Sequence, residues 1–248
     1  MWMEITSSSP TRQIIPIITP VQWKIKKSAG KWKIKKSTGE MLWRKRLPKP
    51  PHCDKIFLYF LDRRERQMGK LYFTRHGQTV WNVENKICGT TDVELTELGH
   101  EQAKELGREI LKRDLGIDGI LCSPLIRAKN TAEHIAQMTG LPLRVEPRLM
   151  EQNFGKFEST PRDGKDFLRE KMQFVNSFGN GESMLRLCQR IYNLLDELKE
   201  ESGKTGKVYL LVAHNGIARA VHSYFYDMTN EEYAASGMKN CQLREYNF

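Results

Sequence analysis

The sequence has few cysteines and no long apolar run, and both shortages exclude whole classes of protein. Its five cysteines are scattered, odd in number and without a C-x-x-C pair, which argues against a disulfide framework and against a zinc site. No apolar run approaches the roughly 20 residues that a membrane-spanning helix needs. With 39% hydrophobic and 28% charged residues, the composition predicts a soluble protein, for which a reducing cytoplasm is the simplest location.

Nucleotide-binding and metal-binding motifs are also missing. The chain has no P-loop, no G-x-G-x-x-G and no cluster of aspartates, so we expect no nucleotide, no metal and no other cofactor. Its 248 residues are enough for one or two domains with a well-buried core. A small stapled scaffold is therefore excluded.

The net charge of +10 lies in the first quarter of the chain. Residues 1–67 hold 16 Lys and Arg against 5 Asp and Glu, whereas residues 68–248 hold 24 against 25. The basic segment also contains a repeat (WKIKKSAG from Trp23, WKIKKSTG from Trp32), several prolines and no helical periodicity, so we predict a mostly disordered extension. Its lysines and tryptophans suit contact with nucleic acid or an anionic membrane, and a solvated tail without a partner is the plainer alternative. We expect the folded domain to span residues 68–248, with Met68 as a candidate natural start.

From residue 68 onward, strand and helix patterns alternate. Thr96 is expected to cap one helix, whose core face includes Leu98, and Ser123 with Pro124 to open the next. Residues 151–181 are irregular and form a candidate lid. The alternation predicts an α/β fold, a three-layer α/β/α sandwich with a mainly parallel sheet. Strands are expected within 70–76, 118–124, 143–149, 207–216 (the central strand) and 241–246, and helices within 96–114, 124–140, 182–202 and around 218–224.

Two histidines follow predicted strands, His76 in TRHG and His214 in AHNG. Either one alone would suit a half-buried loop histidine. However, Arg75, Arg127 and Glu151 also fall at or just after strand ends, and ligands of such sheets bind at the carboxyl ends of the strands. Two histidines, two arginines and a carboxylate together can bind a phosphate and act on it.

Residues 69 to about 247 resemble the histidine phosphatase superfamily, also called phosphoglycerate mutase-like. The motifs occur in the order and spacing of the family, so the resemblance does not depend on R-H-G alone. It implies the phosphoglycerate mutase-like fold. Asn215 stands where many members have Gly after the second histidine. The matching motifs are LYFTRHGQTVWN, GTTDVELTELGHEQA, SPLIRAKNTAE, EQNFGKFE, GES at 181–183 and VAHNGIARA.

The resemblance implies a role for each matching residue. His76 would be the nucleophile and form a phosphohistidine intermediate, which divides the hydrolysis into two easier steps. Arg75 and Arg127 would bind phosphate oxygens with their charged forks, and His214 would stabilise charge on the same oxygens. Glu151 would protonate the leaving alkoxide and later help to activate water.

Several positions keep alternatives. Glu158 and Glu182 are rival acids, although Glu182 suits the start of its helix better. For Arg127, a surface ion pair with Glu133 is the alternative to phosphate binding. Further candidate phosphate-binding residues are Asn82, Thr79 and Asn215.

The leading prediction is a metal-independent phosphatase of a small phosphorylated metabolite. RHGQT and the short segment of about 30 residues between Glu151 and Ser183 resemble the phosphatase branch rather than the mutases. A phosphoglycerate mutase-type phosphotransferase remains the nearest alternative, and a non-catalytic phosphate-binding or RNA-binding protein the alternative of another class. The lid mixes cations with phenylalanines, so it fits a second anionic group or an apolar one.

Overall fold

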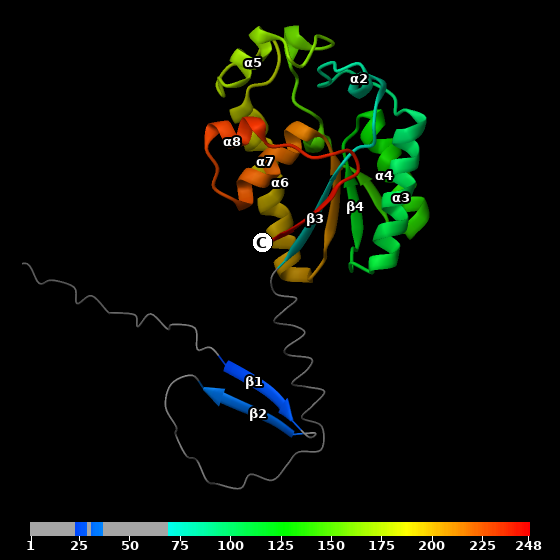
Figure 1. The fold of residues 1–248 in the computed structure, drawn as a ribbon, viewed down its shortest axis with the longest axis vertical. Coiled ribbons are helices and arrows are strands. Elements are labelled where there is room, and N and C mark those ends of the chain that lie inside the picture. The colour runs from blue at the N-terminus through cyan, green and yellow to red at the C-terminus, as the bar shows by residue number, and fades with distance from the viewer. Residues whose placement is uncertain (1–22, 29–30, 37–68) are drawn as a thin grey trace, which may run out of the picture. The chain divides into compact units, whose positions relative to one another are not determined.

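The computed structural model describes residues 23–28, 31–36 and 69–248 (Figure 1). The chain divides into two compact units, Met1–Cys53 and Asp54–Phe248. In the first unit, β1 (Trp23–Ser28) and β2 (Lys31–Lys36) pair as an antiparallel hairpin. The hairpin is built from the sequence repeat, and the sequence analysis did not predict it. The rest of the basic segment, and the predicted boundary at residue 68, lie outside the described residues.

The second unit contains a five-stranded sheet of order β5-β4-β6-β3-β7. Strand β6 is central, as predicted, and it pairs in parallel with β3 and β4. Only β7, at one edge, runs antiparallel to its neighbour β3, so the mainly parallel sheet is confirmed. The strands are β3 (Lys70–Arg75), β4 (Gly119–Cys122), β5 (Leu143–Val145), β6 (Tyr209–Ala213) and β7 (Leu243–Asn247).

Helices cover both faces of this sheet, so the three-layer architecture is also confirmed (Figure 1). Successive strand residues point to opposite faces: Leu71 and Phe73 pack with α6 and α7, whereas Tyr72 packs with α3 and α4. No helix in the described part of the chain is long and apolar enough to cross a membrane. The helices are α2 (Val80–Val83), α3 (Glu97–Arg113), α4 (Ile126–Thr139), α5 (Lys165–Lys171), α6 (Met184–Thr205), α7 (Asn215–Phe225) and α8 (Asn230–Ala235), with 3₁₀ turns at Pro147–Leu149 and Gly155–Phe157.

Two local predictions about helix starts have different outcomes. Thr96 caps α3 as expected, because its hydroxyl accepts a hydrogen bond from the Gly99 N–H. Leu98, expected on the core face, is 54% exposed, since Gly99 beside it takes the packed position. The prediction that Ser123 caps α4 is wrong: the helix begins at Ile126 after Leu125, without a side-chain cap. The Ser123 hydroxyl instead belongs to the functional site.

The candidate lid has a small apolar core of its own. Four phenylalanines and Ile87 form a separate buried cluster, in which most ring pairs meet edge to face. The segment includes α5, which Figure 1 shows at the same end of the sheet as α2. This packing holds the lid segment beside the carboxyl ends of the strands. The phenylalanines are Phe154, Phe157, Phe167 and Phe178.

Candidate active site

The two histidines of the sequence motifs meet at the carboxyl edge of the sheet. Strands β3 and β6 are parallel neighbours, so the residues that follow them emerge side by side. The rings of His76 and His214 lie 5.2 Å apart between centroids. Both are buried, with exposures of 4% and 0%. The structure therefore brings together the pair that the sequence predicted.

His76 is held in one tautomer that suits a nucleophile. Its Nδ1 lies 2.7 Å from the Gly77 carbonyl oxygen, so Nδ1–H donates and Nε2 keeps its lone pair. Burial first, and then the charges of Arg127 and Arg75, lower the pKa of His76 well below 6.5. The imidazole is therefore neutral at pH 7. Gly77 is required at this turn, because a Cβ there would lie 2.3 Å from the Gly99 carbonyl oxygen.

His214 is held in place by Ser123, a residue that was expected to cap α4. Its Nε2 lies 2.7 Å from the Ser123 hydroxyl, and both residues are fully buried. Burial, Arg127 and His76 lower the pKa of His214 well below 6.5, so its ring is neutral as well. If the Ser123 hydroxyl donates to Nε2, the proton of the ring lies on Nδ1. Nδ1–H is then a donor without a partner among the described residues.

Arg127 lies on α4 and is fully buried, which excludes a surface ion pair. The predicted alternative partner, Glu133, instead pairs with Lys129. The guanidinium of Arg127 donates to the carbonyl oxygens of Thr91 at 2.9 Å and Gly89 at 2.7 Å. Neutral carbonyls hold the side chain but leave its charge uncompensated.

Three unpartnered buried nitrogens belong to predicted site residues. Within the part of the chain that the structure describes, four buried side-chain nitrogen or oxygen atoms lack a hydrogen bond: Arg75 Nε, Arg127 Nε, His214 Nδ1 and Gln152 Oε1. Arg75 is anchored through Nη1 to the Met238 carbonyl oxygen at 2.9 Å. Burial lowers the pKa of Arg75 to about 10, so it stays charged at pH 7. Unsatisfied buried donors are rare in proteins, and these suit the oxygens of a phosphoryl group.

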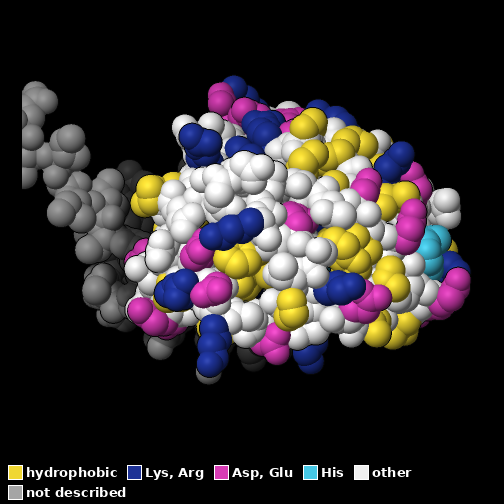
Figure 2. Space-filling view, turned by 90° about the horizontal axis from the view of Figure 1, so that it is seen from above, with side chains coloured by type: hydrophobic (Ala, Val, Ile, Leu, Met, Phe, Trp, Pro, Cys, Tyr) yellow, Lys and Arg dark blue, Asp and Glu magenta, His cyan; other side chains and the backbone are white. Residues whose placement is uncertain are grey.

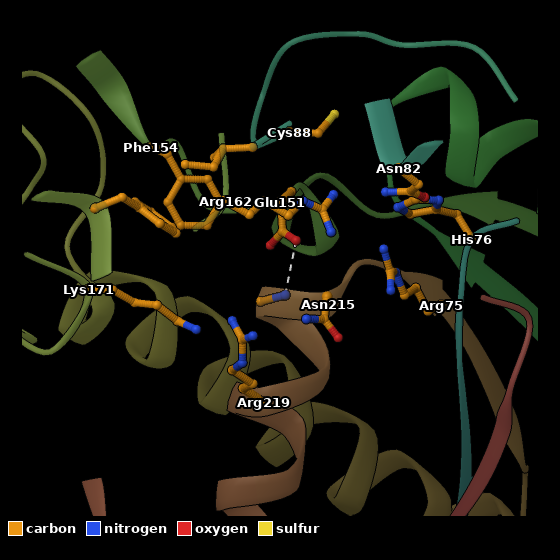
Figure 3. A pocket seen from close by; sticks show the side chains of 13 residues that line it. Arg75, His76, Asn82, Cys88, Glu151, Phe154, Arg162, Lys171, Asn215 and Arg219 are labelled. Atoms are coloured by element: carbon orange, nitrogen blue, oxygen red, sulfur yellow. Dashed lines mark hydrogen bonds between the residues drawn. The ribbon is translucent and has the colours of Figure 1, made fainter. Parts of the chain in front are cut away.

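Glu151 is buried against the N-terminus of α7. Its Oε2 accepts from the Gly216 N–H at 2.9 Å, the contact drawn in Figure 3, and its Oε1 accepts from the Gln152 N–H at 2.9 Å. A Cβ at residue 216 would lie 2.4 Å from Glu151 Oε1, so only glycine permits this approach. The carboxyl group lines the pocket together with His76.

Both rival acids are committed to structural contacts. Glu158 accepts hydrogen bonds from the loop at Gly89–Thr91 and from the Phe154 N–H. Glu182 forms a two-pronged ion pair with Arg190, with both N–O distances 2.8 Å. Neither carboxylate lines the pocket, and Glu151 is the carboxyl group that does.

Two of the three neutral candidates line the pocket. Asn82 does so, with its Oδ1 accepting from the Thr79 N–H and the Asn240 amide. Asn215 does so as well, with its Oδ1 accepting from the Met238 N–H at 2.8 Å. Thr79 does not line the pocket: it is fully buried, and its hydroxyl accepts from the Asn82 N–H as the N-cap of α2. The Thr79 hydroxyl positions Asn82, and its contact with phosphate stays a prediction.

The pocket contains about 610 Å³ of space, its open mouth included, and lies between the histidines and the lid (Figure 3). His214 and Arg127 are fully buried and are not among the residues that line it. Arg162, Lys171 and Arg219 line it but were not among the predicted site residues. Arg219 could have been predicted from the sequence, since it follows Asn215 by four residues and therefore lies on the same face of α7.

Comparisons with known proteins show the family of this chain. Residues 71–248 match the family model of the histidine phosphatase superfamily (branch 1). A protein of Erwinia tasmaniensis named "Probable phosphoglycerate mutase GpmB" is 38% identical over 136 residues, which is 52% of this chain and 62% of that protein. A Yersinia pestis protein of the same name is 32% identical over 188 residues, 73% of this chain and 86% of that protein. A solved structure of mycobacterial glucosyl-3-phosphoglycerate phosphatase with VO3 has a TM-score of 0.63 and 28% identity, covering 71% of this chain and 90% of that one.

Proposed function

The chain belongs to the histidine phosphatase superfamily (branch 1), and from this premise we propose that it hydrolyses a small phosphomonoester, without a metal ion, through a phosphohistidine on His76. The proposal is carried by the neutral His76 ring, whose Nδ1–H is bound to Gly77 while Nε2 keeps its lone pair. Arg75, Arg127 and His214, which have unpartnered donors, lie near this nucleophile. A phosphatase among the structural neighbours supports the hydrolytic reaction.

In the first step, His76 Nε2 attacks phosphorus and the ester P–O bond breaks on the opposite side. The bond places positive charge on the imidazole ring, which the Gly77 carbonyl stabilises through Nδ1–H. Arg75, Arg127 and His214 stabilise the negative phosphoryl oxygens. Glu151 donates a proton to the leaving alkoxide.

In the second step, water attacks the phosphohistidine. Glu151, now a carboxylate, takes a proton from this water, the P–N bond breaks, and phosphate and neutral His76 are released. Both groups return to their starting protonation states, so the cycle balances. The placement of Glu151 on the α7 N-terminus keeps its carboxyl group in the pocket through both steps.

The test measures phosphate release from a panel of phosphorylated metabolites, with and without EDTA. His76→Ala should lower turnover by roughly a thousandfold, and the matched control His100→Ala, on the outer helix α3, should not. Quenched wild-type enzyme should carry an acid-labile phosphoryl group that His76→Ala lacks. Near wild-type turnover by His76→Ala, or complete dependence on added Mg²⁺, contradicts the mechanism.

A phosphoglycerate mutase-type transfer is the second candidate, because the relatives in Erwinia tasmaniensis and Yersinia pestis carry that name. Incubation with 3-phosphoglycerate and 2,3-bisphosphoglycerate separates the two reactions. A phosphatase releases phosphate and forms little 2-phosphoglycerate, whereas a mutase interconverts the two isomers. Phosphate binding without either product would favour a non-catalytic module.

A further inference from the structure

Three cations in the pocket are anchored but not neutralised. Each of Arg162, Lys171 and Arg219 gives one donor to a backbone carbonyl, which fixes its position without opposing its charge. None of the three forms an ion pair with any residue that the structure describes. Four N–H donors of each arginine and two of the lysine remain. The anchoring contacts are Arg162 Nε–Lys86 O at 2.7 Å, Lys171 Nζ–Ala234 O at 2.7 Å and Arg219 Nε–Ser236 O at 2.6 Å.

Two partly buried arginines outside the pocket have carboxylate partners. Arg190 pairs with Glu182, and Arg148 pairs with Glu146. Figure 2 likewise shows basic and acidic side chains interspersed over the surface seen from above. The pocket cations lack such carboxylate partners, which indicates that they bind an anionic ligand instead.

The charge of the pocket exceeds what one phosphate needs. Its lining holds four cationic side chains and a single carboxylate, Glu151, a net charge of +3. A phosphomonoester carries about two negative charges at pH 7. One positive charge is then left over, or two when Glu151 carries the proton that the first step needs, and a second anionic group on the substrate would balance this excess.

The cations are also divided in space. Figure 3 shows Arg75 beside His76 at one side of the pocket, and Lys171 and Arg219 facing each other at the other side. Burial first, and then Arg219, lower the pKa of Lys171 to about 8. Burial also lowers the pKa of Arg162 and Arg219. An anion between the facing cations would remove this repulsion.

We propose that Lys171 and Arg219 form a second anion-binding subsite, so that the substrate is a phosphomonoester whose leaving group carries its own carboxylate or phosphate. This inference rests on the proposed phosphatase function and narrows its substrate class. The phosphoryl group lies at His76 and Arg75, and the second anion binds at this lid-side subsite. Because Lys171 comes from the lid segment and Arg219 from α7, the substrate also bridges these two parts.

The competing explanation is that the three cations only hold the lid in place. Under that explanation, substitutions would lower stability and would affect all substrates equally. A true subsite instead changes the ratio between substrates that differ in the second anion. The ratio therefore separates the two explanations.

The experiment compares kcat/KM for glycerol 3-phosphate, 3-phosphoglycerate and glycerol 1,3-bisphosphate, with phosphate release as readout. The first has no second anion, the second adds a carboxylate and the third adds a phosphate. We expect at least one of the latter two to be favoured over glycerol 3-phosphate by about tenfold or more. Arg219→Gln, and Lys171→Met as a second variant, should bring that ratio close to one. Arg169→Gln is the matched control, because Arg169 is an exposed lid residue paired with Asp166 outside the pocket, and it should keep the wild-type ratio.

Each outcome decides a different question. Equal kcat/KM for all three substrates, or equal losses in Arg219→Gln, overturns the subsite and leaves the phosphatase standing. If none of the three compounds is turned over, the metabolite panel decides the proposed function, and the thermal midpoint with each compound tests the subsite alone. A larger midpoint rise with 3-phosphoglycerate or the bisphosphate than with glycerol 3-phosphate, lost in Arg219→Gln, supports the subsite, and equal rises overturn it.

Discussion

Acidification should destabilise the folded protein through His76 and His214. Both side chains are buried, and burial with nearby arginines lowers their pKa values well below 6.5. In the unfolded chain each has a pKa near 6.5, so below that pH the unfolded state takes up protons that the folded state does not. The two histidines therefore do not lower the free energy of unfolding above pH 6.5, and they lower it progressively as the pH falls below that value. At about pH 5.5, one unit below that pKa, each histidine lowers the free energy of unfolding by about 1.4 kcal/mol, and the pair lowers it by about 3 kcal/mol.

The assay is urea unfolding at about pH 7.5, 6.5 and 5.5 for wild type, His76→Asn and the control His100→Asn. His76→Asn should lose about half of the acid destabilisation that the buried pair produces, or roughly 1.4 kcal/mol, and His100→Asn should lose less. His134 and His222, whose pKa values burial also lowers, are only partly buried and are present in wild type and His76→Asn. An identical pH dependence in wild type and His76→Asn would refute the neutral, buried nucleophile. The proposed first step would then lose its basis.

Three further predictions address the acid, the second histidine and the basic extension. Glu151→Gln should slow hydrolysis of alkyl phosphates strongly and of p-nitrophenyl phosphate little, because nitrophenolate leaves without a proton; equal losses would place the acid elsewhere. Ser123→Ala should lower kcat by about tenfold, because His214 loses the partner that sets its tautomer, and Ser123→Thr should restore much of it. Unchanged kcat and pH profile in Ser123→Ala would contradict that role. Deletion of residues 1–67 should leave phosphate release and the thermal midpoint unchanged, and a large drop in either would show that the extension packs on the domain.

The strands and the histidine pair could be predicted because their signals are local. An apolar run followed by a polar turn marks a buried strand end, and His76 and His214 each follow such a run. Parallel pairing then forces the two ends to the same edge. Glu151 was also within reach, since it follows a shorter strand closely. The order of the strands could not be predicted in the same way, because it depends on contacts across the whole sheet.

Other residues were misassigned because a local motif and a tertiary contact competed for the same atom. Ser123 before Pro124 has the pattern of a helix start, but its hydroxyl binds His214, 91 positions away. Thr79 follows the loop that carries His76, but its hydroxyl accepts a hydrogen bond from the Asn82 N–H and so caps α2. The sequence shows which hydroxyls are present, and the fold decides which partner each one takes.

The glycine near the second histidine shows how such a long-range contact sets a local requirement. This chain has Asn215 directly after His214 and glycine one place later. The structure requires glycine at 216, because Glu151 approaches that backbone from 65 positions away and a Cβ would collide with its carboxylate. Residue 215 does not have to be glycine, and the amide side chain of Asn215 lines the pocket. The Asn215–Gly216 order therefore preserves the contact between Glu151 and the α7 N-terminus, and it adds a neutral amide beside the proposed phosphoryl group.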